Sequence, residues 1–362
     1  MTPGQVLLTA LTVIGLSCAS SIAVIATAKF RRGRAAVRST ALLAPYRRAL
    51  IVMASGEDDD GQAKAVLYAV PAPSWARLRS SVVAFPPKVR GTPAEDLREL
   101  LRWHGEIDRA KRMLTSRSTV RRAGAAYLLG LVRDADSATL LLPLLTDTDP
   151  DVRLLTARAL GAIGEPSGAA GVLLALRSQH RQIGVPAWVA TEALLAMGIQ
   201  IAPQLQIGLV SQDPAVRNVC ALVAGHGIFS SAVPQLRIML ATDGDADVRA
   251  SALALGRVGS ADDVAVLARL TDASQPTVLR RTCATALGEL GRDESLDTLK
   301  GLLADGDLRL AALAADSLVR IGSKGIARLE DAAVEQSPRA QVAPGALDLA
   351  GLRGQLAVGA VA

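Results

Sequence analysis

The strongest constraint on this chain is an internal repeat of about 32 residues that runs over about residues 116–336. One glycine position and its equivalents fall at residues 130, 161, 195, 225, 256, 288 and 319, in steps of 31, 34, 30, 31, 32 and 31 residues. A fixed period in this range is the signature of a solenoid or a propeller, where a unit buries its apolar face by stacking on its neighbours. The repeat therefore predicts a stacked array of about seven units.

The chemistry of one unit indicates that the array is helical. Asp149 can cap a helix, Pro150 suits the first helical position, and Asp151 faces the positive end of the helix dipole. Gly164 is placed to end this helix in a left-handed conformation, and Pro166 starts a second one. An aromatic content of only 2% is also typical of packed helices with small side chains rather than of a β-sandwich. Each unit is therefore predicted to be a pair of short helices.

Several residue types recur at matching positions and are predicted to build the repeat. They are Asp149, Pro150, Val152, Arg153, Gly161, Gly164, Asp213, Arg217, Asp247, Arg249, Gly256, Gly259, Gly288, Gly291 and Gly322. The recurring arginines at 121, 153, 217, 249, 281 and 309 stand near aspartates at 151, 213, 247 and 307. We expect an Asp–Arg ladder between repeats, although a functional basic ridge is the alternative.

The net charge of +6 is concentrated near the N-terminus. Residues 1–56 hold seven basic and no acidic residues, while the rest of the chain holds 33 basic and 34 acidic ones. Residues 6–28 are an uncharged run long enough to cross a bilayer, and four basic residues follow it: Lys29, Arg31, Arg32 and Arg34. The positive-inside rule then predicts a cell-membrane anchor with its N-terminus outside and the repeats in the cytoplasm.

Two readings of this N-terminal region stay open. The small residues Ala26 and Ala28 resemble a signal-peptide cleavage site, but no basic residue precedes the apolar run. The basic cluster could also attract an anionic membrane surface in addition to setting orientation.

These features predict four segments. Residues 1–28 form the transmembrane anchor, 29–115 a basic and irregular helical connector, 116–336 the repeat solenoid, and 337–362 a poorly ordered tail.

The opening Asp-Pro-x-Val-Arg at 149–153 and the closing Ala-Leu-Gly-x-Ile-Gly at 159–164 resemble HEAT repeats. The resemblance is to the short variety also seen in phycobilin-lyase-like proteins, and it covers about residues 116–336. It implies an all-α, right-handed α-solenoid of helix pairs, here preceded by one transmembrane helix. With its anchor, the chain is similar to the membrane-tethered HEAT-repeat proteins of bacteria, which suggests a glycosyltransferase of the envelope as one partner.

The sequence offers little for catalysis or for metal and cofactor binding. Deoxyhypusine hydroxylase, a HEAT-like enzyme, holds its di-iron site with His-Glu dipeptides, whereas none of the three histidines here is followed by Glu. No motif identifies a bilin site, so we expect no cofactor and no metal. A near-neutral repeat region with few aromatic residues is also a poor nucleic-acid surface.

The cysteines of the repeat region and the longest repeat step each allow a structural and a functional interpretation. Cys220 and Cys283 occupy the same small position of the repeat, which favours buried packing over a redox or metal pair. The 34-residue step carries Arg181 and Trp188, types enriched in binding hot spots; the alternative is a loop insertion with Trp188 in the core.

The predicted function is therefore a membrane-anchored cytoplasmic scaffold that binds a membrane-associated protein and has no catalysis of its own. The first alternative is a lyase or oxidoreductase built on the same repeats, and the second is a nucleic-acid-binding protein.

Overall fold

The computed structural model describes residues 43–176, 184–241, 245–334 and 344–348. Helices and short 3-10 turns make up the regular structure of these ranges, with no strand among them. The chain divides between Ile107 and Asp108 into two compact units, so that most of helix α5 (Glu106–Met113) belongs to the second unit.

Within those ranges, no helix is both long and apolar enough to cross a membrane. The expected span at 6–28 and its flanking Lys29, Arg31, Arg32 and Arg34 lie outside the described residues, as does most of the tail at 337–362.

The first unit is a small bundle around a tryptophan. It contains a helix over 43–55 followed by α2 (Gln62–Tyr68), α3 (Ala72–Val83), the 3-10 turn η1 (Pro86–Lys88) and α4 (Thr92–Trp103). The Trp75 indole Nε1–H donates to the buried Glu106 carboxylate at 2.8 Å. The ring of His104 stacks on Trp75 with centroids 3.7 Å apart, and its Nε2 lies 3.0 Å from the Leu67 carbonyl oxygen. His104 is therefore a packed residue of this bundle.

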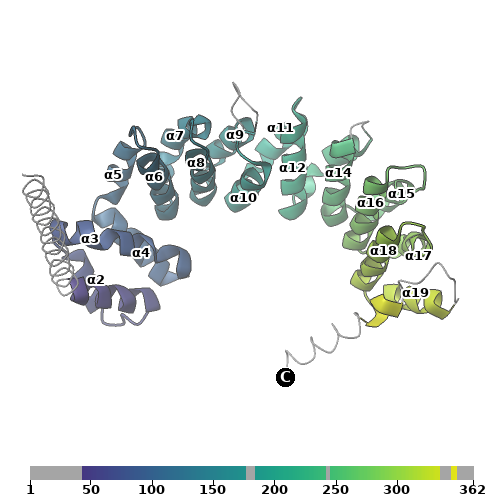
Figure 1. Cartoon of the computed structure of the whole chain (residues 1–362), viewed down its shortest axis with the longest axis horizontal. Helices are drawn as coiled ribbons and strands as arrows, with labels where there is room; N and C mark the ends of the chain where they lie inside the picture. The colour runs from purple at the N-terminus through teal and green to yellow at the C-terminus, as the bar shows by residue number, and fades with distance from the viewer. Residues whose placement is uncertain (1–42, 177–183, 242–244, 335–343, 349–362) are drawn as a thin grey trace, which may run out of the picture. The chain divides into compact units, whose positions relative to one another are not determined.

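The second unit is built from two layers of helices (Figure 1). In the first layer, seven longer helices carry the repeat glycine positions and each contacts the next one along the chain. They are α6 (Thr119–Val132), α8 (Pro150–Ile163), α10 (Ala187–Met197), α12 (Pro214–His226), α14 (Asp245–Val258), α16 (Thr277–Leu290) and α18 (Leu308–Ile321).

The second layer consists of the second helix of each repeat unit. It consists of α7 (Ala138–Leu141), α9 (Pro166–Leu174), α11 (Ala202–Leu209), α13 (Val233–Leu240), α15 (Val264–Arg269), α17 (Leu296–Leu302) and α19 (Ser323–Val334). Short 3-10 turns introduce or extend several of these helices. The apolar stripes of the two layers meet in a continuous core, where for example Val152, Leu160 and Val172 have no exposed surface.

Small residues set the spacing of the first layer. A Cβ built on Gly161 would lie 2.7 Å from the Cα of Ala193 in the next helix, far inside van der Waals contact. The same approach recurs between Gly256 and Ala286, and between Gly288 and Ser317. These glycines are therefore required by close backbone approach, which also explains why a core of this size contains so few aromatic residues.

The ends of the repeat helices follow the sequence prediction closely. The Asp149 carboxylate accepts hydrogen bonds from the backbone N–H groups of Asp151 and Val152, and Pro150 opens the helix. Asp213 caps α12 in the same way. Positive φ values occur at Gly164, Gly291 and Gly322, while Gly259, at the matching position, has none.

The Asp–Arg ladder is present, but the predicted arginine set is partly wrong. Arg217 donates to Asp247 at 3.0 Å and Arg281 to Asp307 at 2.7 Å, each across one repeat. The buried Arg153 instead donates to the carbonyl oxygens of Asp147 and Thr148 in its own unit.

Two arginines of the first-layer helices that lie outside the predicted set join the ladder, and Arg237 of α13 makes a further pair with Asp263 at 2.7 Å. Arg122 pairs with Asp147 at 2.7 Å, and Arg280 pairs with Asp305.

Arg122, Arg153, Arg217 and Arg280 all stand eight residues before the repeat glycine position, so helical phase does not separate them. The difference lies in the partner: each ladder pair uses an aspartate just before or at the start of the next first-layer helix, whereas no acidic residue occurs between Glu165 and Glu192 to meet Arg153. Arg249 lies half-buried on α14.

Candidate protein-binding surface

The third unit, α10 and α11, departs from the repeat in a way that changes the packing. Leu195 occupies the position that is glycine in α8, α12, α14 and α16. A leucine side chain there prevents the close backbone approach seen elsewhere. Helices α10 and α12 accordingly contact each other less than any other pair of successive first-layer helices. The unit that the sequence marks by its 34-residue step is therefore also the one where the stack loosens.

Trp188 lies on the surface at the start of α10, with 58% of its side chain exposed. The guanidinium of Arg158 on α8 sits 5.3 Å from the centre of the indole ring. Arg158 also pairs with Glu192 of α10 at 3.0 Å. A pair this exposed adds little stability, but it holds the guanidinium over the ring. Trp188 is thus a positioned, solvent-facing aromatic residue and not part of the core.

A shallow cavity lies between α6 and α8, the helix that also carries Arg158. Its volume is about 540 Å³, and its lining is mixed: Val120, Tyr127, Leu154 and Leu155 line it together with the acidic Asp149 and Asp151. Val120 is 79% exposed. We use the name Trp188 face for Trp188 on α10 with Arg158 over its ring, together with the cavity residues of α6 and α8. Arg181, the second residue expected here, lies outside the described residues.

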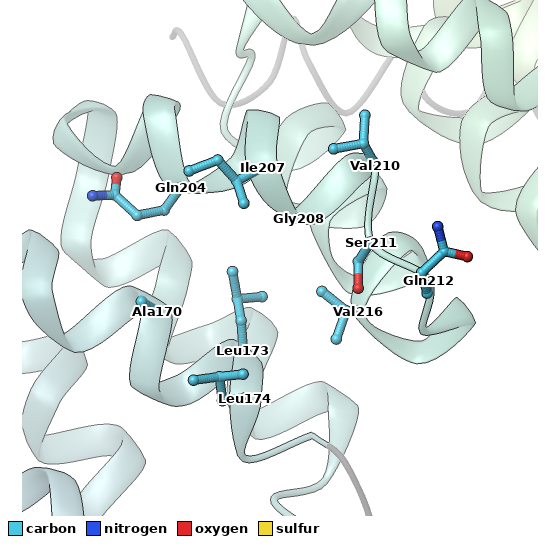
Figure 2. Close-up of a pocket in the computed structure, with 10 residues that line it drawn as sticks. All are labelled: Ala170, Leu173, Leu174, Gln204, Ile207, Gly208, Val210, Ser211, Gln212 and Val216. Carbon is cyan, nitrogen blue, oxygen red and sulfur yellow. The ribbon is translucent and has the colours of Figure 1, made fainter.

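A second cavity opens on the other layer of the same region. It lies between α9, α11 and α12, has a volume of about 550 Å³, and is lined mainly by aliphatic side chains. Figure 2 shows Leu173, Ile207 and Val216 projecting from these three helices toward one space. We call this cavity the α9–α11 groove. It is absent from the sequence prediction, although the uncharged stretches at 166–176 and 193–212 were a signal for it.

The two repeat-region cysteines are packing residues. Both are free and fully buried, in the position that holds the equally buried Thr156 and Ser251 in other units. Burial raises the pKa of Cys220 and that of Cys283 to about 12, so both thiols stay protonated at neutral pH.

Across the part of the chain that the structure describes, no group of three or more His, Cys, Asp or Glu side chains is arranged to hold a metal ion. The geometry that stands out in this region is instead apolar and exposed, as expected of surfaces that contact other macromolecules.

Comparison with known proteins gives a match over the repeat region. A family model of HEAT repeats matches residues 108–194 and 202–284. A search of curated proteins found no match.

Several solved structures align over most of their length at low identity. The complex of CpcE and CpcF of phycocyanin lyase from a Nostoc species is 18% identical, with 67% of this chain and 94% of that chain covered and a TM-score of 0.34. Human deoxyhypusine hydroxylase in complex with glycerol is 17% identical, with 86% and 97% covered and a TM-score of 0.27. An engineered protein is 18% identical, with 85% and 99% covered and a TM-score of 0.36. TM-scores this low carry no argument about function.

Proposed function

We propose that this HEAT-repeat protein is a membrane-tethered scaffold that binds a protein partner through the Trp188 face. HEAT repeats imply protein–protein interaction in general. The observation that carries the proposal is Trp188 itself: a large aromatic side chain held in solvent by Arg158 at a unit that departs from the repeat. Tryptophan and arginine are the residues most enriched in binding hot spots.

The tether belongs to the same proposal. It rests on the uncharged run at 6–28 and on the basic residues that follow it, which under the positive-inside rule favour a cytoplasmic location for the repeats. Such an anchor confines the search for a partner to the membrane surface. A membrane-associated enzyme of the envelope, such as a glycosyltransferase, is the class of partner that the resemblance to tethered HEAT-repeat proteins suggests.

Crosslinking in intact membranes of the native host tests the binding site. The full chain and a Trp188→Ala variant are compared, with Val278→Ala as the matched control because Val278 is 56% exposed on the first-layer helix α16. Loss of a hot-spot tryptophan weakens binding by about 2 kcal/mol or more, or roughly thirtyfold. We expect the captured partner to disappear in Trp188→Ala and to persist in Val278→Ala. Equal capture by all three proteins would show that the partner binds elsewhere.

A reporter fused to the C-terminus tests the topology separately. Activity of a reporter that works only in the cytoplasm supports the proposed orientation. Activity only of an exported reporter contradicts it, without bearing on the Trp188 face.

A further inference from the structure

The α9–α11 groove differs from the rest of the second layer in its charge. Helices α7, α9 and α11 carry no charged side chain. From α13 onward every second-layer helix carries at least one, beginning with Arg237. A cavity at α15 and α17 shows the contrast, because Arg269, Asp272 and Asp297 line it. Grooves on this side of the second unit are thus not all alike, and this one is apolar.

The rim of the groove exposes aliphatic side chains to solvent. Leu174 is 57% exposed, Ile207 72% and Val210 57%, while Leu173 and Val216 form the buried floor (Figure 2). A small ligand inside the cavity would leave this rim uncovered, so the occupant has to be a macromolecule.

The known modes of peptide recognition narrow the occupant to a helix. The groove runs between helices and offers no strand edge to which an extended peptide could be added. The described residues that line it include no aromatic side chain to hold a polyproline segment, and no arginine to hold a phosphate or an acidic motif. An apolar helix face laid into an apolar groove is the mode that remains.

The absence of charge in the groove indicates which face of a partner helix would fit it. Because none of the ten lining residues that the structure describes is charged, a charge on the partner's face would be buried there without an opposite charge from them. The same absence of basic and aromatic residues argues against a bilayer surface, which proteins contact with lysine, arginine and tryptophan. We propose that the α9–α11 groove binds an amphipathic helix of another protein through an uncharged aliphatic face with anchors at i, i+3 or i+4, and i+7.

Site-specific photocrosslinking of the full chain in its native host tests this inference, which rests on the proposed binding role but concerns a different surface. Val210 is replaced by the photoreactive residue benzoylphenylalanine, and the crosslinked peptide is sequenced. The matched control places the same residue at Ile238, which is 59% exposed on α13 beside Arg237. A second pair of variants adds Ile207→Asp or Ile238→Asp to the Val210 crosslinker.

We expect a crosslink from position 210 to a peptide with the aliphatic spacing above and no charge on that face. Ile207→Asp should reduce its yield at least about tenfold, because an unpaired carboxylate would be buried in the complex, and Ile238→Asp should not. Four results would overturn the inference: a crosslink to lipid, to this chain's own sequence, to a peptide with a charged face, or no crosslink above the Ile238 control. Capture through Trp188 is measured independently, so failure of the groove and failure of the proposed function are distinguishable.

Discussion

The repeat glycines provide a matched pair of substitutions on a single helix. Gly130 and Gly124 both lie inside α6, and neither is among the glycines with positive φ. A Cβ at Gly130 would lie 2.5 Å from the Cα of Ala159 and 2.8 Å from its Cβ. A Cβ at Gly124 would meet no atom within 4 Å. The two positions therefore differ in packing but not in secondary structure.

The expected effects have opposite signs. Carbon atoms in contact sit about 3.5–4.0 Å apart, so Gly130→Ala forces α6 and α8 apart by roughly 1 Å. Overpacking costs about 1–3 kcal/mol, and the upper end applies because the Ala159 backbone cannot rotate away. Alanine is about 1 kcal/mol more favourable than glycine inside a helix, so the net destabilisation of Gly130→Ala is about 2 kcal/mol. Gly124→Ala causes no overpacking, so it should stabilise the fold by up to about 1 kcal/mol through helix propensity alone.

Thermal unfolding followed by far-UV circular dichroism measures both variants against the parent chain. For a domain of this size, each kcal/mol shifts Tm by about 2–4 °C. We expect Gly130→Ala to lower Tm by about 4–8 °C and Gly124→Ala to raise it by up to about 4 °C. Because repeat arrays can unfold in parts, hydrogen exchange of the α6 and α8 amides should locate the change. Equal shifts for the two variants would refute the claim that glycine is there for backbone approach.

Three further predictions concern the ladder, the thiols and the caps. Arg281 holds the pKa of the Asp307 carboxyl at about 2. The ionised carboxylate therefore stabilises the fold fully above its unfolded pKa of about 4, and this stabilisation is lost as pH falls through about 2. Asp307→Asn should flatten the fall of Tm between about pH 4 and pH 2, and an unchanged profile would contradict the pairing. With Cys18 replaced by serine, Cys220 and Cys283 should react with Ellman's reagent at neutral pH only after unfolding, and rapid labelling of the folded chain would contradict their burial. Asp149→Ala should lower the free energy of unfolding by about 1 kcal/mol through loss of the cap, and the Asn substitution should restore most of it.

The helix pairs were predictable because their signals are local. A cap, a proline at the first helical position and a terminal glycine act within one turn, so Asp149, Pro150 and Gly164 could be assigned from sequence alone. The small position shared by Cys220 and Cys283 was likewise readable, because the period aligns equivalent sites and a buried site in one unit is buried in the others.

The partners of the arginines were not predictable to the same degree. Arg281 and Arg280 are adjacent in sequence, yet they pair with Asp307 and Asp305 respectively. Both therefore reach the next unit. Which aspartate each one meets depends on how the two helices are rotated against each other, and a period of about 32 residues does not contain that rotation.

The candidate surfaces divide in the same way. The sequence by itself determined that α10 belongs to an irregular unit and that two stretches near it lack charge. Only the tertiary structure decided that Trp188 faces solvent under Arg158, and that Leu173 and Val216, 43 residues apart in the chain, form one groove floor. The physical reason is that a solenoid's local rules act within one unit, whereas a surface arises from the contacts between units, and one leucine at a glycine position is enough to alter those contacts.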